Sequence, residues 1–121
     1  MGVTSFFKTI AESKELHSDV QLRSRYYKTN YAKAKAVLLE YAKQESIDVR
    51  SVDDEHRELF FQGSRFHIIV SLVQVNPIET SVDFKVEYYG LFGMNRPKNT
   101  ILKLYQYLDQ NLSFKGVGLH P

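Results

Sequence analysis

The chain has 121 residues, of which 43% are hydrophobic and 25% charged, and its formal net charge is only +2. This composition is typical of one packed domain, so we expect residues 1–121 to form a single domain. The sequence contains no cysteine, which excludes disulfides, thiolate catalysis and cysteine-bound zinc. No segment approaches the roughly 20 apolar residues of a membrane span, and the N-terminus does not read as a signal peptide, so we expect a cytoplasmic protein without a membrane partner.

The N-terminal part of the chain predicts one helix and one strand. Residues 4–15 carry apolar side chains at helical spacing behind Thr4, a residue type that caps helices. Residues 19–28 alternate between apolar and polar positions, which predicts a half-buried strand. In this strand one side would face the core with Val20, Leu22 and Tyr26, and the other side would carry Gln21, Arg23, Arg25 and Tyr27.

The middle of the chain predicts a long helix followed by a hairpin. Asn30 precedes an apolar stripe that runs to Gln44 at spacings of three and four, which indicates a capped, core-facing helix. Residues 47–52 alternate with period two and predict a strand. Two segments rich in β-branched and aromatic residues, 58–61 and 65–75, are separated by Gln-Gly-Ser, so we predict a β-hairpin in which Gly63 takes a positive φ.

Residues 65–75 are apolar at both sets of alternate positions, which is typical of a strand in the middle of a sheet. Asn76-Pro77 predicts a turn, because proline has no N–H for a sheet hydrogen bond. In the strand that follows, alternation places Val82, Phe84, Val86 and Tyr88 inward and Asp83, Lys85, Glu87 and Tyr89 outward. The loop 90–97 then leads into an amphipathic helix that ends near Asn111, and the tail is predicted to pack loosely.

The element order is therefore α-β-α-β-β-β-β-α. Consecutive strands with short turns pair mostly antiparallel, and two amphipathic helices can cover only one face of a sheet. The sequence predicts a two-layer α+β fold with a mainly antiparallel sheet of about five strands and helices on one face. In element order alone it resembles the TATA-binding-protein-like (TBP-like) and helix-grip folds, and this resemblance implies no activity.

The sequence contains no glycine-rich phosphate loop, nucleophile motif or metal-binding motif, so we predict no catalytic residue, no metal site and no cofactor, and we lean toward a protein that is not an enzyme. His67, with Ser71 or Asp83 as its partner, is the best candidate for a catalytic base, because imidazole titrates near neutrality. We rank a second interpretation above the catalytic one, in which His67 only forms hydrogen bonds on the face of the sheet. The acidic run 53–56 is interpreted as a solvated turn, since its spacing matches no calcium loop.

The face of the sheet without helices is the predicted binding surface. It combines tyrosines with apolar side chains, and such side chains bury large areas at protein interfaces. We therefore predict a non-enzymatic binding module that forms a homodimer or binds a protein partner. The predicted contact residues are Arg23, Arg25, Tyr27, His67, Ile69, Ser71, Val73, Lys85 and Tyr89.

Two alternatives stay open. A nucleic-acid-binding module would combine bases with an aromatic ring, although acidic residues on the same face would repel phosphate; its residues would be Arg23, Arg25, Tyr27 and Lys28. A small apolar ligand would instead bind between the long helix and the sheet. That pocket would be lined by Leu38, Tyr41, Phe61, Phe66 and Phe84, which otherwise fill the core.

Overall fold

The fold is described by a computed structural model that covers residues 9–90 and 96–120. The elements in chain order are β1 (Ile10–Glu12), the 3₁₀ turn η1 (Val20–Leu22), β2 (Arg25–Tyr27), α2 (Tyr31–Gln44), β3 (Asp48–Asp53), β4 (Glu58–Gln62), β5 (Phe66–Asn76), β6 (Glu79–Tyr88), α3 (Arg96–Asn111) and β7 (Phe114–Val117).

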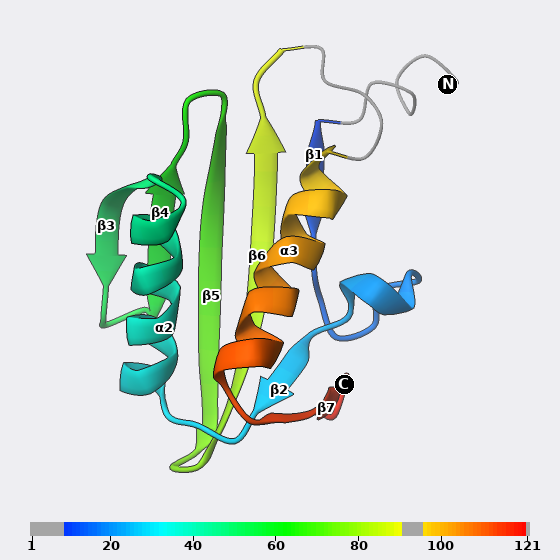
Figure 1. The fold of residues 1–121 in the computed structure, drawn as a ribbon. Coiled ribbons are helices and arrows are strands. Elements are labelled where there is room, and N and C mark those ends of the chain that lie inside the picture. Colours follow the sequence, from blue (N-terminus) through cyan, green and yellow to red (C-terminus); the bar gives the residue numbers. More distant parts are fainter. Residues whose placement is uncertain (1–8, 91–95, 121) are drawn as a thin grey trace.

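Within the described residues, seven strands form one antiparallel sheet in the order β3-β4-β5-β6-β2-β7, and β1 pairs with the same edge of β6 as β2 does. The two described helices, α2 and α3, lie on one face of this sheet (Figure 1). The predicted two-layer α+β fold with helices on one face is therefore confirmed.

The two helices begin where the sequence predicts. The Asn30 side chain accepts a hydrogen bond from the backbone N–H of Lys33 (2.9 Å), which satisfies one of the donors left unpaired in the first turn of α2. Pro97 is the second residue of α3, where its missing N–H costs nothing. Both helices bury the predicted apolar stripe.

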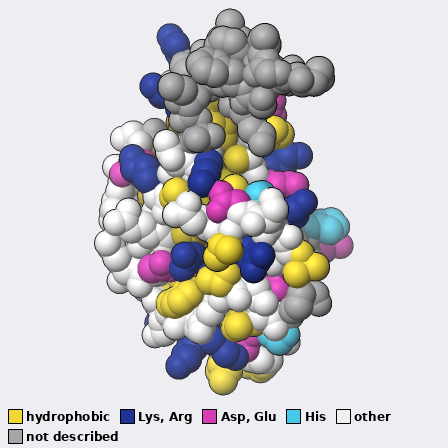
Figure 2. All heavy atoms as spheres, turned by 90° about the vertical axis from the view of Figure 1, so that its right-hand side faces the viewer, with side chains coloured by type: hydrophobic (Ala, Val, Ile, Leu, Met, Phe, Trp, Pro, Cys, Tyr) yellow, Lys and Arg dark blue, Asp and Glu magenta, His cyan; other side chains and the backbone are white. Residues whose placement is uncertain are grey.

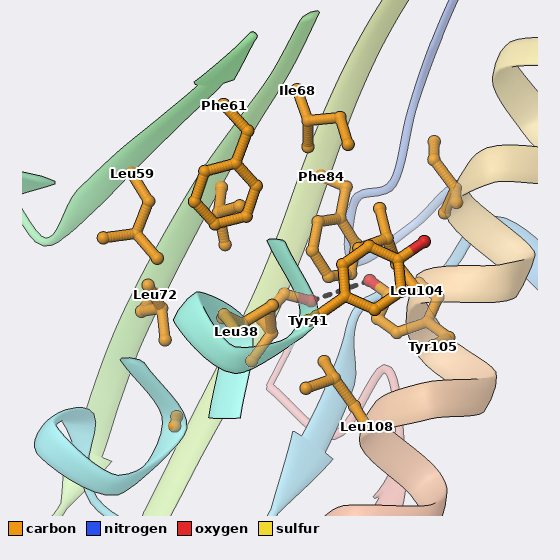
Figure 3. Packing of buried hydrophobic residues seen from close by; sticks show 14 of the residues in the cluster. Leu38, Tyr41, Leu59, Phe61, Ile68, Leu72, Phe84, Leu104, Tyr105 and Leu108 are labelled. Atoms are coloured by element: carbon orange, nitrogen blue, oxygen red, sulfur yellow. Dashed lines mark hydrogen bonds between the residues drawn. The ribbon is translucent and has the colours of Figure 1, made fainter. Parts of the chain in front are cut away.

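One core joins the helices to the sheet (Figure 3). Side chains of β4, β5 and β6 meet those of α2 and α3 there, and most of them are fully buried: Leu38, Leu59, Phe61, Ile68, Val70, Val82, Phe84, Val86, Leu104 and Leu108. The even-numbered residues of β5 and β6 enter this core. Because successive side chains of a strand point to opposite faces, the odd-numbered residues of both strands face away from the helices.

The strand β5 lies in the middle of the sheet, as its two apolar sets predict. It pairs with β4 along one edge and with β6 along the other. In the described part of the chain, helices cover only one of its faces. The prediction that a central strand is shielded on one side is therefore confirmed.

The ends of the chain differ from the prediction. The sequence predicts a helix over residues 4–15, but Ile10–Glu12 form the strand β1. Residues 4–8 of this predicted helix lie outside the described residues. The backbone of Ile10–Glu12 pairs with β6, and such pairing outweighs the weak helical preference of a short segment. The tail also joins the sheet, since Phe114–Val117 pair with β2 as β7.

The strand predicted over residues 19–28 is interrupted by η1 and retains only Arg25–Tyr27. The turn interrupts the alternation, so the side chains of residues 25–27 point to the faces opposite to those predicted. Arg25 pairs with Val82 and Tyr27 with Thr80, which places both side chains toward the helices, while Tyr26 faces away. The predicted outward position of Arg25 and Tyr27 is wrong.

The hairpin between β4 and β5 is present, but the reason for its glycine differs. The positive-φ glycines among the described residues are Gly90 and Gly118, so the positive φ predicted for Gly63 is wrong. A Cβ on Gly63 would lie 2.3 Å from the Phe66 ring. A side chain at this position would displace the Phe66 ring, which packs against the turn.

Replacement of Tyr105 by phenylalanine tests the polar contact of α3 with the sheet. The Tyr105 hydroxyl donates to the carbonyl oxygen of Val82 (2.7 Å) and contacts Ser13 Oγ (2.8 Å) inside the protein. Its loss leaves buried partners unsatisfied, so we expect Tyr105→Phe to lower the free energy of unfolding by about 1–3 kcal/mol in urea titrations.

The matched control is Tyr107→Phe on the same helix. The Tyr107 side chain is half-buried, and its hydroxyl makes no hydrogen bond within the described residues. We expect a change of less than about 0.5 kcal/mol. Equal losses in the two variants would contradict the role of the Tyr105 hydroxyl.

Candidate functional site

The face of the sheet away from α2 and α3 is called the outer face. Strand register arranges its side chains in rows that cross β4, β5, β6 and then β1 or β2. The first row is Gln62, His67, Glu87 and Ile10; the second is Phe60, Ile69, Lys85 and Glu12; the third is Glu58, Ser71 and Asp83; the fourth is Val73, Ser81 and Tyr26.

Apolar side chains are exposed where the outer face follows β5. The exposed fraction is 57% for Val73 and 41% for Val75, and Ile78 in the next turn reaches 75%. This lower end of the β5–β6 hairpin extends past the ends of both helices (Figure 1). Exposed apolar side chains that adjoin one another mark an interaction surface more often than isolated ones do.

A buried polar network crosses the sheet at Asp83. One oxygen of this carboxylate accepts hydrogen bonds from Ser13 Oγ and Ser24 Oγ, both at 2.8 Å. Ser13 Oγ in turn accepts the backbone N–H of Phe84 (2.9 Å) and is reached by Tyr105 from the helix side. The network can pass through the sheet here because neither neighbouring strand pairs with residues 83–84 of β6. The strand β1 pairs with residues 85–87 and β2 with residues 80–82.

The charge of Asp83 is poorly compensated. Burial raises the pKa of its carboxyl, and the nearby Glu15 raises it further, although hydrogen bonds from Ser13 and Ser24 act in the opposite direction. None of the ion pairs among the described residues includes Asp83. The outer face therefore holds an acid that a positively charged group from outside the chain would stabilise.

A depression of about 400 Å³ adjoins Asp83, Val73 and Val75 on the outer face. Lys14 and Glu15 on one segment and His120 of the tail form its sides. Glu15 ties these two segments to β2, because it accepts hydrogen bonds from the Tyr26 hydroxyl (2.6 Å) and from the backbone N–H of His120 (2.9 Å).

The tail is also held from its other side. The His120 ring packs on Tyr26, with 5.1 Å between ring centroids, and its Nε2 lies 2.8 Å from a Glu79 carboxylate oxygen. Lys115 pairs with the same carboxylate. The depression thus has a fixed rim.

At the opposite end of the outer face, His67 belongs to an aromatic and polar cluster. Its ring stacks on Phe60 (5.2 Å between centroids, 20° between planes), and its Nδ1 lies 2.8 Å from the Tyr89 hydroxyl. Within the described residues no hydrogen bond joins His67 to Ser71 or Asp83. The hydrogen-bond partner of His67 is therefore Tyr89, and not Ser71 or Asp83, the two partners suggested for a catalytic role.

The structure brings together most of the residues predicted for the contact surface. His67, Ile69, Ser71, Val73, Lys85 and Tyr89 lie on the outer face. Arg23 lies beside β2, where its Nε donates to the carbonyl oxygen of His17 (2.8 Å). Several outer-face residues were not predicted: Glu15, Tyr26, Phe60, Gln62 and His120.

Arg25 and Tyr27 do not belong to this surface. Arg25 pairs with Asp109 of α3 (3.2 Å), and the Tyr27 hydroxyl donates to the same carboxylate (2.7 Å). Tyr27 is fully buried. Since Arg25 and Tyr27 face the helix side of the sheet, the arrangement of bases and aromatic ring proposed for nucleic acid is absent from the outer face.

The five residues predicted to line a ligand pocket between helix and sheet are divided between the core and a hollow at its border. Leu38, Phe61 and Phe84 are fully buried parts of the core. Tyr41 and Phe66, the other two predicted lining residues, reach a hollow between α2 and α3. Leu38, Phe61 and Phe84 therefore fill the core and do not line a pocket.

Acidic residues predominate at the outward strand positions. On β1, β4, β5 and β6 these positions carry Lys85 and the acids Glu12, Glu58, Asp83 and Glu87. On the side of the molecule shown in Figure 2, acidic, basic and hydrophobic side chains are interspersed, and the described atoms form no continuous basic surface. This distribution favours a positively charged partner over a polyanion.

Within residues 9–90 and 96–120 no group of three or more histidine, aspartate or glutamate side chains could hold a metal ion. In the same ranges no helix is both long and apolar enough to cross a bilayer.

Comparison of the chain with protein-family models, with curated proteins and with solved structures found no match. The function is therefore inferred from the geometry of this chain.

The unusual ionisation of Asp83 predicts a pH dependence of stability. A raised pKa in the folded protein contributes stability that is present below the ordinary value of 3.8 and is lost as the pH rises through the folded pKa. We expect the stability of the wild type relative to Asp83→Asn to increase as the pH falls, by about 1.4 kcal/mol for each unit of pKa difference. Urea unfolding at a series of pH values measures this.

Glu79→Gln is the control of opposite sign. Lys115 and His120 lower the pKa of Glu79, so its contribution is present above the ordinary pKa and is lost as the pH falls through the folded pKa. The stability of the wild type relative to Glu79→Gln should therefore decrease with acidification. A difference between wild type and Asp83→Asn that stays constant with pH would show that burial does not perturb Asp83.

Proposed function

We propose that the protein is a non-enzymatic interaction module whose outer face binds a positively charged, partly apolar segment of another protein. The observation that carries the proposal is the position of Val73 and Val75, exposed on the central strand beside the half-buried Asp83, which has no ion-pair partner among the described residues. An apolar strip and an acidic centre on one face match a partner that offers both kinds of side chain.

The apolar part supplies the driving force. Removal of apolar surface from water stabilises a complex by about 25 cal/mol per Å², before the costs of association are subtracted. Val73, Val75 and Ile78 provide such surface at one end of the outer face, while Phe60 and Ile69 extend it along the sheet. β-Branched side chains on a strand are already ordered, so little side-chain entropy is lost on binding.

The acidic part selects the partner. In a two-fold dimer through this face, acids near the axis of one copy would meet the same acids of the other, which disfavours self-association. Glu58, Asp83 and Glu87 would also repel phosphate groups. A lysine or arginine from a partner protein would instead compensate these charges.

The proposal is tested with two fluorescein-labelled peptides, one of alternating arginine and valine and one with glutamate in place of arginine. We expect the basic peptide to bind and the acidic one to fail in anisotropy titrations. Glu58→Lys reverses an exposed charge on the outer face and should weaken binding about tenfold, or about 1.4 kcal/mol. Val73→Ser should weaken it by reducing the apolar area.

Glu40→Lys is the matched control, because it makes the same charge change at an exposed position of α2 on the helix side. Equal effects of Glu40→Lys and Glu58→Lys, or equal binding of the two peptides, would reject the outer face as a site for basic segments. Sedimentation gives a separate answer. A wild-type dimer that Val73→Ser converts to a monomer would make the occupant a second copy of the chain and overturn the choice of partner.

A further inference from the structure

The helix layer has a second surface feature, independent of the outer face. Two adjoining hollows of about 330 and 300 Å³ lie between α2 and α3. Both are lined by Tyr41, Glu45 and Lys103, so they are continuous across these residues. Together they are called the interhelical groove.

Flat aromatic surfaces line the groove. Phe66 and Tyr88 stack on each other at one end, with 5.0 Å between centroids and 24° between planes. Tyr41 and Tyr107 meet edge to face at 5.1 Å. The absence of a side chain at Gly63 allows the Phe66 ring to lie against the hairpin turn at this end. A planar ring is the ligand shape that such surfaces contact best.

The Tyr41 hydroxyl is an unused donor in the groove. Tyr41 is only 7% exposed, yet its hydroxyl has no hydrogen-bond partner within the described residues. The hydroxyl oxygen is accessible at the groove and can therefore donate to a bound molecule. Burial, together with the nearby Glu45 and Tyr88, raises the pKa of Tyr41 to about 12, so the hydroxyl keeps its proton at neutral pH.

Two opposite charges complete the lining. Glu45 closes the C-terminal end of α2, and Lys103 lies on the facing helix α3. Neither side chain forms an ion pair within the described residues, which means that both charges are available to a ligand. Separated charges of opposite sign beside aromatic rings match a small molecule that carries both signs of charge and a ring.

We propose that the interhelical groove binds a small aromatic zwitterion with the chemistry of a free aromatic amino acid. The ring would pack against Phe66 and Tyr88, the ammonium group would lie toward Glu45 and the carboxylate toward Lys103. The volume of each hollow is at the lower end of the range for small-molecule sites, which fits a ligand of this size. None of these residues lies on the outer face, so this site and the proposed protein contact stand or fall separately.

Free L-tryptophan is the probe, because the protein contains no tryptophan and the ligand alone then emits when it is excited beyond the tyrosine absorption band. We expect the anisotropy of its emission to rise and saturate as protein is added. Lys103→Glu and Glu45→Lys should each weaken binding about tenfold, and Tyr41→Phe by a smaller factor. Lys43→Glu, an exposed change on α2 outside the groove, should leave binding unchanged.

Competition by ligand fragments tests the zwitterion itself. Tryptamine lacks the carboxylate and 3-indolepropionate lacks the ammonium group, so each should compete less well than L-tryptophan. No rise in anisotropy, or equal weakening by Lys43→Glu and Lys103→Glu, would overturn the site. Equal competition by 3-indolepropionate would overturn the role of Glu45, and equal competition by tryptamine that of Lys103. Urea unfolding of each variant confirms that a loss of binding is not a loss of fold.

Discussion

The alternation of β5 is the constraint on which the rest of the structure depends. Its even-numbered side chains point into the core between the sheet and the described helices. Their burial fixes the register of β4 and β6, the two strands beside it. A shift by one residue would place Ile68, Val70 and Leu72 in water and bring His67 and Ser71 into the core. The same packing that stabilises the fold therefore leaves the odd-numbered set, with Val73 and Val75, on the outer face.

A second feature follows from how the sheet ends beside β6. Two short strands, β1 and β2, share one edge of this long strand, and the gap between them falls at Asp83 and Phe84. Through this gap Tyr105 and Ser13 satisfy backbone groups that the sheet leaves unpaired. The cost is a carboxylate that is desolvated without a counter-charge, and it is this group that gives the outer face its acidic centre.

The two proposed sites lie on opposite layers and use different physics. The outer face is broad, with apolar and acidic side chains in rows, and suits an extended contact with a protein segment. The interhelical groove is narrow and is lined by rings from both layers, with Tyr41 and Tyr107 on the helices and Phe66 and Tyr88 on the sheet.

The sequence by itself determined the elements whose pattern is local and long: both described helices, the strands β3 to β6, the turn at Asn76-Pro77 and the outward position of His67, Ile69 and Lys85. Periodicity and capping encode these directly, because each needs only neighbours along the chain. Phe60 could have been placed as well, from the alternation of its strand. Tertiary structure alone decided that Ile10–Glu12 and Phe114–Val117 are strands, that Arg25 and Tyr27 bind Asp109 on the helix side of the sheet, and that Glu15 and His120 border the depression at Asp83. These outcomes depend on partners far away in the sequence, whose pairing outweighs the weak preference of a three- or four-residue segment.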